Sequence, residues 1–294
     1  MPLIARNLSK TYKDDVESQT VFSGVSIDLD SGESLLVVGL KGAGKSTLIN
    51  ILGCLEAPTD GSYLIGETDP LTFNRHKIAR FRRDYLGFLF SEPYLAPQLT
   101  VLENVLVPCL ATGLPLKSDV SFAKELLEQM KISDCQDSYP QTLSADQRQR
   151  TAAVRAMVKR PTLILADEPV ALLDSRLAEA FIDNFLAAQK MAGSMLVLTS
   201  DCMEFKEKFD RVAKLEKKRW TISGRQKYGV EVDDAPPVFG FSSDSAAPSL
   251  GFEQTDDEVI IEPENVQTPQ KSNREEERQV VKENELESFR RRFQ

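Results

Sequence analysis

The sequence is poor in the residue types from which many functional sites are built. It contains a single histidine, His76, and four cysteines without C-x-x-C spacing. Because protein zinc sites use closely spaced cysteines and histidines, this pattern argues against a bound zinc ion. We expect His76 to lie on the surface. We expect the thiols to be reduced and mostly in the core, and they belong to Cys54, Cys109, Cys135 and Cys202.

Long hydrophobic runs are missing as well. The longest, such as SLLVVG and LILA, are far shorter than the ~20 apolar residues that a helix needs to cross a bilayer. The opening stretch MPLIARNLSKTYKDD has no apolar core of the kind found in a signal peptide. We therefore expect a cytoplasmic protein, unless a partner holds it at a membrane.

Positive charge is absent from one long segment, residues 231–270, which contain no lysine or arginine. The whole chain of 294 residues has a net charge of −9, and most of it belongs to residues 223–294, with 16 acidic and 9 basic side chains. Binding to nucleic acid requires a basic surface, so we expect no nucleic-acid partner.

The composition divides the chain in two. Residues 223–294 begin with stretches rich in Pro, Gly and Ser that cannot bury enough apolar surface to offset the entropy of ordering, so we predict an acidic, mostly disordered tail. Ser272 and Glu275 fit a capping box, which indicates a terminal helix over 272–293. A packed helix and a frayed, solvent-exposed one both fit its sequence.

Residues 1–222 are predicted to form one α/β domain. The segment 1–38 contains short β-like stretches separated by polar turns, and helical and strand patterns alternate from there to about Lys218. This order favours an α/β fold with an antiparallel β element at its start.

The motif G-x-x-x-x-G-K-S runs from Gly39 to Ser46, between an apolar strand and a helical segment. In such a P-loop, backbone N–H groups and the helix N-terminus attract phosphates, the lysine reaches the β and γ phosphates, and the serine hydroxyl can ligate Mg²⁺. The predicted ATP-binding residues of this segment are Gly39, Leu40, Lys41, Gly42, Ala43, Gly44, Lys45, Ser46 and Thr47.

A second apolar strand, in LILADEP, ends in Asp167 and Glu168. A carboxylate at the end of a strand beside a P-loop can hold the hydration shell of Mg²⁺, so we assign Asp167 to the metal together with Ser46. The next carboxylate can orient or deprotonate an attacking water, so Glu168 is the candidate catalytic base.

In their order and spacing these motifs resemble the ATP-binding subunit of an ABC transporter, in the subgroup of lipoprotein-releasing, macrolide-export and cell-division ATPases. The resemblance covers about residues 1–220 and implies a helical signature subdomain at about 92–158. It also rests on LTVLENV (99–105), YPQTLSADQRQR (139–150), RPTLILADEP (160–169), LLDS (172–175) and LTSD (198–201).

The resemblance further implies that the domain closes head to tail with a second ATP-binding subunit, as a homodimer or a heterodimer. Tyr12 matches the aromatic that stacks on adenine, although an ordinary core or surface tyrosine also fits its position. Ser144 matches the signature serine, and Asp174 matches the aspartate that links the two sites. Residues 88–105 match the surface that packs on a separate transmembrane permease subunit, which would place the protein at the inner face of the cell membrane.

Three positions depart from the family pattern. Ser91 stands where the family has a glutamine that reaches the Mg²⁺ and the attacking water, and Ser200 stands where it has a histidine that holds the γ-phosphate. Ala145 and Asp146 replace the two glycines after the signature serine, and a carboxylate there is expected to repel the phosphate. The resemblance together with these changes predicts an ATPase with slow or conditional hydrolysis.

Other functions remain open. A catalytically impaired pseudo-ATPase would act as a nucleotide-gated regulatory scaffold that recruits a tail-binding protein. The tail would alternatively be an autoinhibitory arm at the basic surface around residues 75–83. A soluble ABC protein without a transport role is less favoured, because such proteins commonly join two nucleotide domains in one chain and this chain has room for one.

Overall fold

A computed structural model describes residues 1–13, 18–111, 113, 115–216 and 219–223. These residues fall within the first of two compact units, Met1–Glu231. The predicted tail beyond residue 223, including the helix expected over 272–293, lies outside the described residues.

The chain begins with an antiparallel sheet of three strands in the order β2-β1-β4. These strands are β1 Leu3–Lys13, β2 Ser18–Leu29 and β4 Asp60–Ile65. The predicted antiparallel element at the start is therefore confirmed. The third strand of this sheet is β4. The last β-like stretch of residues 1–38, SLLVV, is fully buried and pairs with parallel strands of the main sheet instead.

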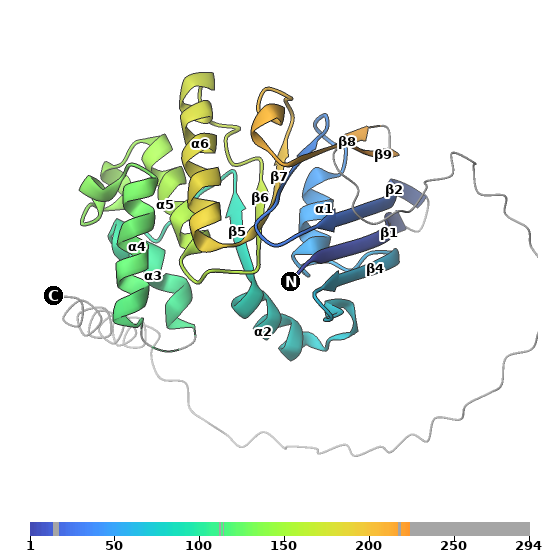
Figure 1. The fold of residues 1–294 in the computed structure, drawn as a ribbon, viewed down its shortest axis with the longest axis horizontal. Helices are drawn as coiled ribbons and strands as arrows, with labels where there is room; N and C mark the ends of the chain where they lie inside the picture. The colour runs from blue at the N-terminus through green and yellow to red at the C-terminus, as the bar shows by residue number, and fades with distance from the viewer. Residues whose placement is uncertain (14–17, 112, 114, 217–218, 224–294) are drawn as a thin grey trace, which may run out of the picture. The chain divides into compact units, whose positions relative to one another are not determined.

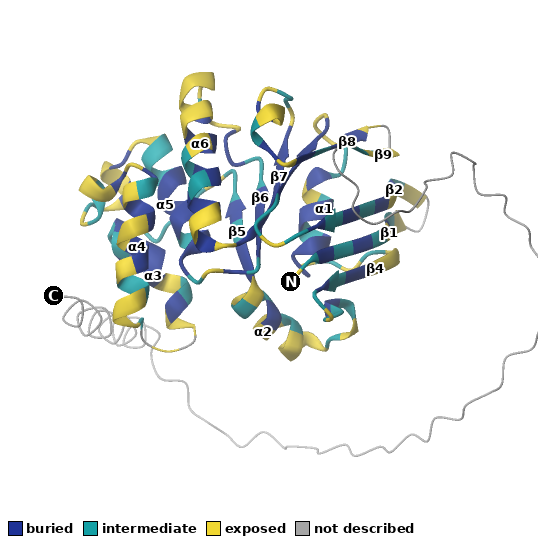
Figure 2. Cartoon of the chain, in the orientation of Figure 1, coloured by how far each residue is buried: buried dark blue, intermediate teal, exposed yellow. Residues whose placement is uncertain are grey.

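The main sheet has six strands in the order β5-β6-β7-β3-β8-β9, and all are parallel except β9. In β3 and β7 every residue is buried, as expected for parallel strands covered on both faces (Figure 2). The strands are β3 Ser34–Val38, β5 Leu86–Phe90, β6 Leu163–Asp167, β7 Met195–Ser200, β8 Arg211–Glu216 and β9 Arg219–Ser223.

Six α-helices accompany the two sheets in the described part of the chain (Figure 1). They are α1 Lys45–Leu52, α2 Arg75–Tyr85, α3 Val101–Leu110, α4 Lys117–Gln129, α5 Ala145–Met157 and α6 Ser175–Ala192. Four short 3₁₀ helices connect them: η1 Pro70–Thr72, η2 Ser133–Cys135, η3 Pro140–Thr142 and η4 Lys206–Lys208. None of the helices described is long and apolar enough to cross a bilayer.

Local sequence signals explain where the helices start and stop. Thr100 and Glu103 form a capping box at the start of α3, and Asp174 caps α6 by accepting from the Leu177 amide. The long α6 ends at Gly193 in the left-handed conformation. Helices α3, α4 and α5 lie within the range predicted for a helical subdomain.

Helix α1, which follows the P-loop, packs between the two sheets (Figure 1). Leu48 and Ile49 on α1 share one buried cluster with Phe22 of the antiparallel sheet and Val37 of the main sheet. The Tyr63 hydroxyl of β4 donates to the Leu52 carbonyl at the end of α1 (2.7 Å), and the ring is fully buried. The antiparallel sheet is thereby hydrogen-bonded to the helix that carries the P-loop.

Tyr63→Phe is expected to lower the free energy of unfolding by about 1–3 kcal/mol, because the buried Leu52 carbonyl loses its donor. Urea denaturation measures this change. The matched control is Tyr85→Phe, because Tyr85 is 39% exposed. Its free energy of unfolding should change by no more than ~0.5 kcal/mol. Equal changes in the two variants would show that the buried hydrogen bond contributes nothing specific.

Candidate functional site

The P-loop turns back at the end of β3 and depends on glycine at two positions. The Gly39 amide donates to the Ser200 carbonyl (3.2 Å), and a Cβ at Gly39 would lie 2.5 Å from the Leu215 carbonyl oxygen. Gly44 caps α1 with φ of 100°, a left-handed conformation that favours glycine. The close approach of β8 and the start of α1 therefore require these two glycines.

The Lys45 side chain is buried and gathers the polar groups of the loop. Its Nζ donates to the carbonyls of Gly39 (2.6 Å) and Leu40 (3.2 Å) and lies 2.9 Å from the Glu168 Oε1. The structure thus brings together the P-loop lysine and the candidate base, which are far apart in the sequence. A phosphate group bound by this loop would meet both side chains.

The ends of β6 and β7 place Asp167 beside Thr199. The Thr199 hydroxyl donates to the Asp167 Oδ1 (2.7 Å) and accepts from the Glu168 amide (3.0 Å). Glu168 has φ of 47°, so this hydrogen bond helps to hold a backbone conformation that non-glycine residues rarely adopt. Sequence reasoning assigned no role to Thr199, although its place in LTSD directly before Ser200 was visible.

The remaining predicted P-loop residues lie along the turn between β3 and α1. Ser46 is exposed in the first turn of α1, with Thr47 half-buried beside it. The tip of the loop is also open to solvent, and its exposed residues are Leu40, Lys41 and Gly42, with Ala43 half-buried.

The Ser200 hydroxyl lies against its neighbour Cys202, whose Sγ is 3.6 Å from the Ser200 Oγ. The Ser200 side chain is buried, and its oxygen accepts a hydrogen bond from the Cys202 amide (3.2 Å). Ser91 is half-buried directly after β5, and the Gln149 side chain donates to the carbonyl of its neighbour Phe90 (2.7 Å). Both positions thus lie at strand ends of the main sheet.

Tyr12 lies in the last part of β1, with 41% of its surface exposed. Its hydroxyl donates to the Glu56 Oε2 (2.9 Å), and the Lys10 Nζ lies 4.9 Å from the centre of its ring. Lys10 also pairs with the Glu56 Oε1 (2.8 Å). Burial raises the pKa of Glu56, but the hydrogen bonds from Lys10 and Tyr12 outweigh it, so the pKa lies below its ordinary value. Neither Lys10 nor Glu56 was anticipated from the sequence.

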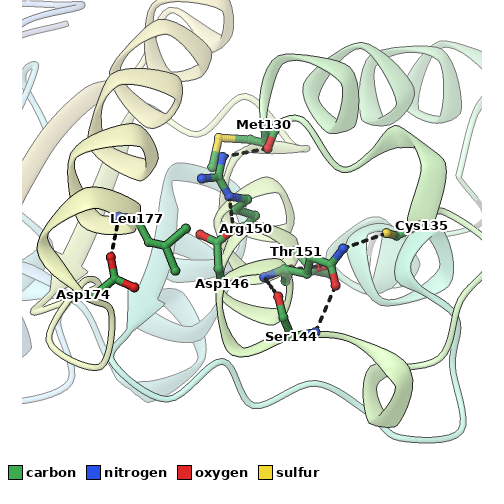
Figure 3. Close-up of polar contacts among 9 residues, drawn as sticks. Met130, Cys135, Ser144, Asp146, Arg150, Thr151, Asp174 and Leu177 are labelled. Atoms are coloured by element: carbon green, nitrogen blue, oxygen red, sulfur yellow. Dashed lines mark hydrogen bonds and ion pairs between the residues drawn. The ribbon is translucent and has the colours of Figure 1, made fainter.

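Ser144 is exposed and caps α5 through a capping box with Gln147 (Figure 3). The Asp146 carboxylate does not face solvent at this helix end. Its Oδ2 forms an ion pair with the Arg150 Nε (2.7 Å). The expectation that a carboxylate at this position repels a phosphate did not include this partner, a positive side chain one turn further along the helix that attracts the carboxylate inward.

Asp174 lies apart from this pair at the start of α6, where it is exposed and its Oδ1 accepts from the Leu177 amide (2.9 Å) (Figure 3). The histidine prediction is confirmed, since His76 is exposed on α2. The prediction of core thiols holds for two cysteines only. Cys54 and Cys109 are buried, and burial raises their pKa to about 12 and about 11, whereas Cys135 and Cys202 are half-buried.

A glycine-rich loop between a buried parallel strand and a helix, with an Asp-Glu pair on a nearby strand, defines a P-loop nucleotide-binding protein. Within that class the chain belongs to the ABC transporter family, whose model matches residues 22–171. The fold class and the resemblance predicted from the sequence are therefore confirmed.

Known relatives support this assignment. The lipoprotein-releasing system ATP-binding protein LolD 1 of Rhodopirellula baltica is 38% identical over 214 residues, which is 71% of this chain and 93% of that protein. The macrolide export ATP-binding/permease protein MacB of Shigella flexneri is 36% identical over 67% of this chain, but this match spans 30% of the MacB length.

Solved structures agree in fold. A dimeric structure of MJ0796, a bacterial ABC transporter cassette, has a TM-score of 0.66 and 30% identity over 74% of this chain and 97% of that one. A second dimeric structure of the same cassette, described as a post-hydrolysis state bound to ADP and Pi, has a TM-score of 0.65 with the same identity and coverage.

Tyr12→Phe is expected to raise the pKa of Glu56, because it removes one hydrogen bond that favours the ionised carboxylate. The stability that Glu56 contributes is present above its unfolded pKa and is lost as the pH falls through its lower folded pKa. A site-resolved NMR titration of the Glu56 carboxyl measures its pKa in the folded protein. The control is Tyr94→Phe, which removes a hydroxyl in another segment. If the titration midpoint of the Glu56 carboxyl is unchanged in Tyr12→Phe, the expectation is contradicted.

Proposed function

We propose that this chain binds ATP and Mg²⁺ and closes head to tail with a second ATP-binding subunit to drive or gate a separate transmembrane permease. The 2.9 Å contact between the Lys45 Nζ and the Glu168 Oε1 carries the proposal, because it joins a phosphate-binding cation to a candidate base. The names of the relatives, a lipoprotein-releasing ATPase and a macrolide exporter, support a role at the inner face of a membrane.

The P-loop residues 39–47 bind the phosphates in this proposal. Their backbone amides and the start of α1 favour negative charge, and Lys45 supplies the cation. Ser46 and Asp167 are the metal-facing pair. A hydroxyl, a carboxylate, waters and substrate phosphates are the oxygen ligands that Mg²⁺ takes in such sites, so the residues present fit the ion. Bound Mg²⁺ would neutralise charge that develops on the phosphates.

The remaining predicted residues act at the edges of the site. Glu168 orients or deprotonates the attacking water, and Thr199 holds the Glu168 amide and the Asp167 carboxylate in place. Tyr12 stacks on adenine with the ring face that Lys10 leaves open. Ser144 and Asp174 serve the site across the dimer interface.

Hydrolysis is proposed to be slow or conditional. Ser91 is too short to replace a glutamine, and the Ser200 oxygen accepts from the Cys202 amide instead of presenting an imidazole. Each missing preorganised donor costs roughly 10²–10³ in rate, and the effects of neighbouring groups do not simply add. Contact with the permease along residues 88–105 would then regulate turnover.

The buried Ser200 also supports a second candidate, a pseudo-ATPase that binds nucleotide without useful turnover. In that role domain 1–222 is a nucleotide-gated regulatory scaffold, and the acidic tail 223–294 recruits a tail-binding protein. The absence of Lys and Arg from residues 231–270 suits a basic partner surface.

Glu168→Gln distinguishes these functions in a steady-state ATPase assay with parallel measurement of ATP binding. We expect the unchanged protein to hydrolyse ATP and the variant to bind it with a turnover reduced by roughly 10²–10⁴-fold. Glu128→Gln, at an exposed position of α4, is the matched control. If all three proteins bind ATP and none exceeds background, the pseudo-ATPase scaffold replaces the motor.

Thr199→Val should slow ATP hydrolysis by roughly 10–100-fold, because Glu168 and Asp167 lose the hydroxyl that holds them. Thr199→Ser keeps that hydroxyl and is expected to retain most of the turnover. The same assay, with circular dichroism to check folding, measures both. Equal turnover in the valine and serine variants would remove Thr199 from the catalytic arrangement.

A further inference from the structure

The ion pair between Asp146 and Arg150 lies at the start of α5, beside the signature serine. We propose that Arg150 is a positioning residue that holds the Asp146 carboxylate against the helical subdomain and so keeps the α5 N-terminus open to a phosphate. This inference rests on the proposed head-to-tail dimer, in which α5 of one subunit meets the ATP of another.

Arg150 is itself held firmly on three sides. Its Nε binds the Asp146 Oδ2 (2.7 Å), and its Nη1 donates to the Met130 carbonyl at the end of α4 (3.0 Å) (Figure 3). Its guanidinium also lies 6.0 Å from the centre of the Phe181 ring on α6. The two paired side chains are 6% and 16% exposed, so the carboxylate is attached to a buried, fixed cation.

The first two residues at the outer end of the helix have small side chains. Ser144 and Ala145 are exposed, and the Ser144 oxygen accepts from the Gln147 amide (3.1 Å). The Asp146 carboxylate is directed toward Arg150 and away from Ser144 (Figure 3). A phosphate that approached the end of the helix would therefore meet a hydroxyl, a methyl group and backbone amides.

Arg150 is the residue that keeps the carboxylate in this place. The other oxygen, Oδ1, is buried and has no hydrogen-bond partner in the part of the chain that the structure describes. Without Arg150 the buried negative charge would be uncompensated, and its favourable position would be in water at the exposed helix end. There it would repel a phosphate of the same sign. The role of Arg150 thus depends on the presence of Asp146.

The experiment measures ATP- and Mg²⁺-dependent dimerisation by sedimentation velocity, with every variant in a Glu168→Gln background to prevent turnover. We expect Arg150→Gln to raise the dimer dissociation constant by about tenfold or more through repulsion, and added salt should reduce the effect. Arg150→Lys, which keeps the charge, should dimerise like the parent. The double variant Asp146→Asn/Arg150→Gln should also dimerise like the parent, because residue 146 then carries no negative charge.

A second pair of variants avoids the risk that Arg150→Gln unfolds. Ala145→Asp places a carboxylate at the exposed helix end, where it is compatible with the helix dipole, and Ala145→Asn is its neutral control. We expect Ala145→Asp alone to weaken dimerisation by about tenfold or more. Dimerisation equal to the parent would overturn the inference, since a free carboxylate there would then be harmless.

Three further results would overturn it. Loss of dimerisation in Arg150→Gln that Asp146→Asn does not restore would mean that Arg150 acts through its packing on Met130 and Phe181. If the parent binds ATP but stays monomeric, the proposed dimer fails and this inference fails with it. Normal dimerisation of the parent and of Arg150→Gln would overturn the inference alone and leave the proposed function standing.

Discussion

Parallel pairing of β6, β7 and β3 is the constraint on which the site depends. The register aligns Asp167 with Thr199 and Val38 with Ser200, so three strands end at the same edge of one sheet. The residues at these ends come from distant parts of the sequence, yet the Gly39 amide donates to the Ser200 carbonyl and the Glu168 amide to the Thr199 hydroxyl. Both faces of β3 and β7 are buried, so a shift of one residue would exchange the side chains that pack against the two covering layers and disturb the packing on both.

Much of this arrangement could be predicted because the signals are local. The spacing of the P-loop glycines and the apolar run before Asp167 each lie within a short stretch. Contacts between distant segments could not be predicted in the same way. Glu56 lies 44 residues from Tyr12, and nothing near either residue indicates that they share a hydrogen bond. The pairing of β4 could not be predicted either, because β4 joins the first sheet although it follows the P-loop helix in the sequence.

The three departures from the family pattern differ in their physical character. At Ser91 and Ser200 a short side chain stands where the resemblance implies a longer polar one. At Asp146 a side chain has been added, and the helix already carries a cation at the spacing that can neutralise it. A side chain that is too short to contact its target is difficult to compensate at the rigid edge of a sheet. An added charge on a helix, in contrast, can be neutralised by a residue one turn away. Judged by sequence alone, all three changes look equally damaging.

The capping box at the start of α5 has a consequence for the chemistry of the Ser144 hydroxyl. A hydroxyl group has one hydrogen to donate and two lone pairs to accept with. In the capping box its oxygen accepts from the Gln147 amide, and the Ser144 amide donates separately to the Gln147 side chain. Helix capping therefore consumes a lone pair and leaves the proton unused. The Ser144 hydroxyl can thus stabilise its own helix and at the same time donate a hydrogen bond to an acceptor outside the subunit.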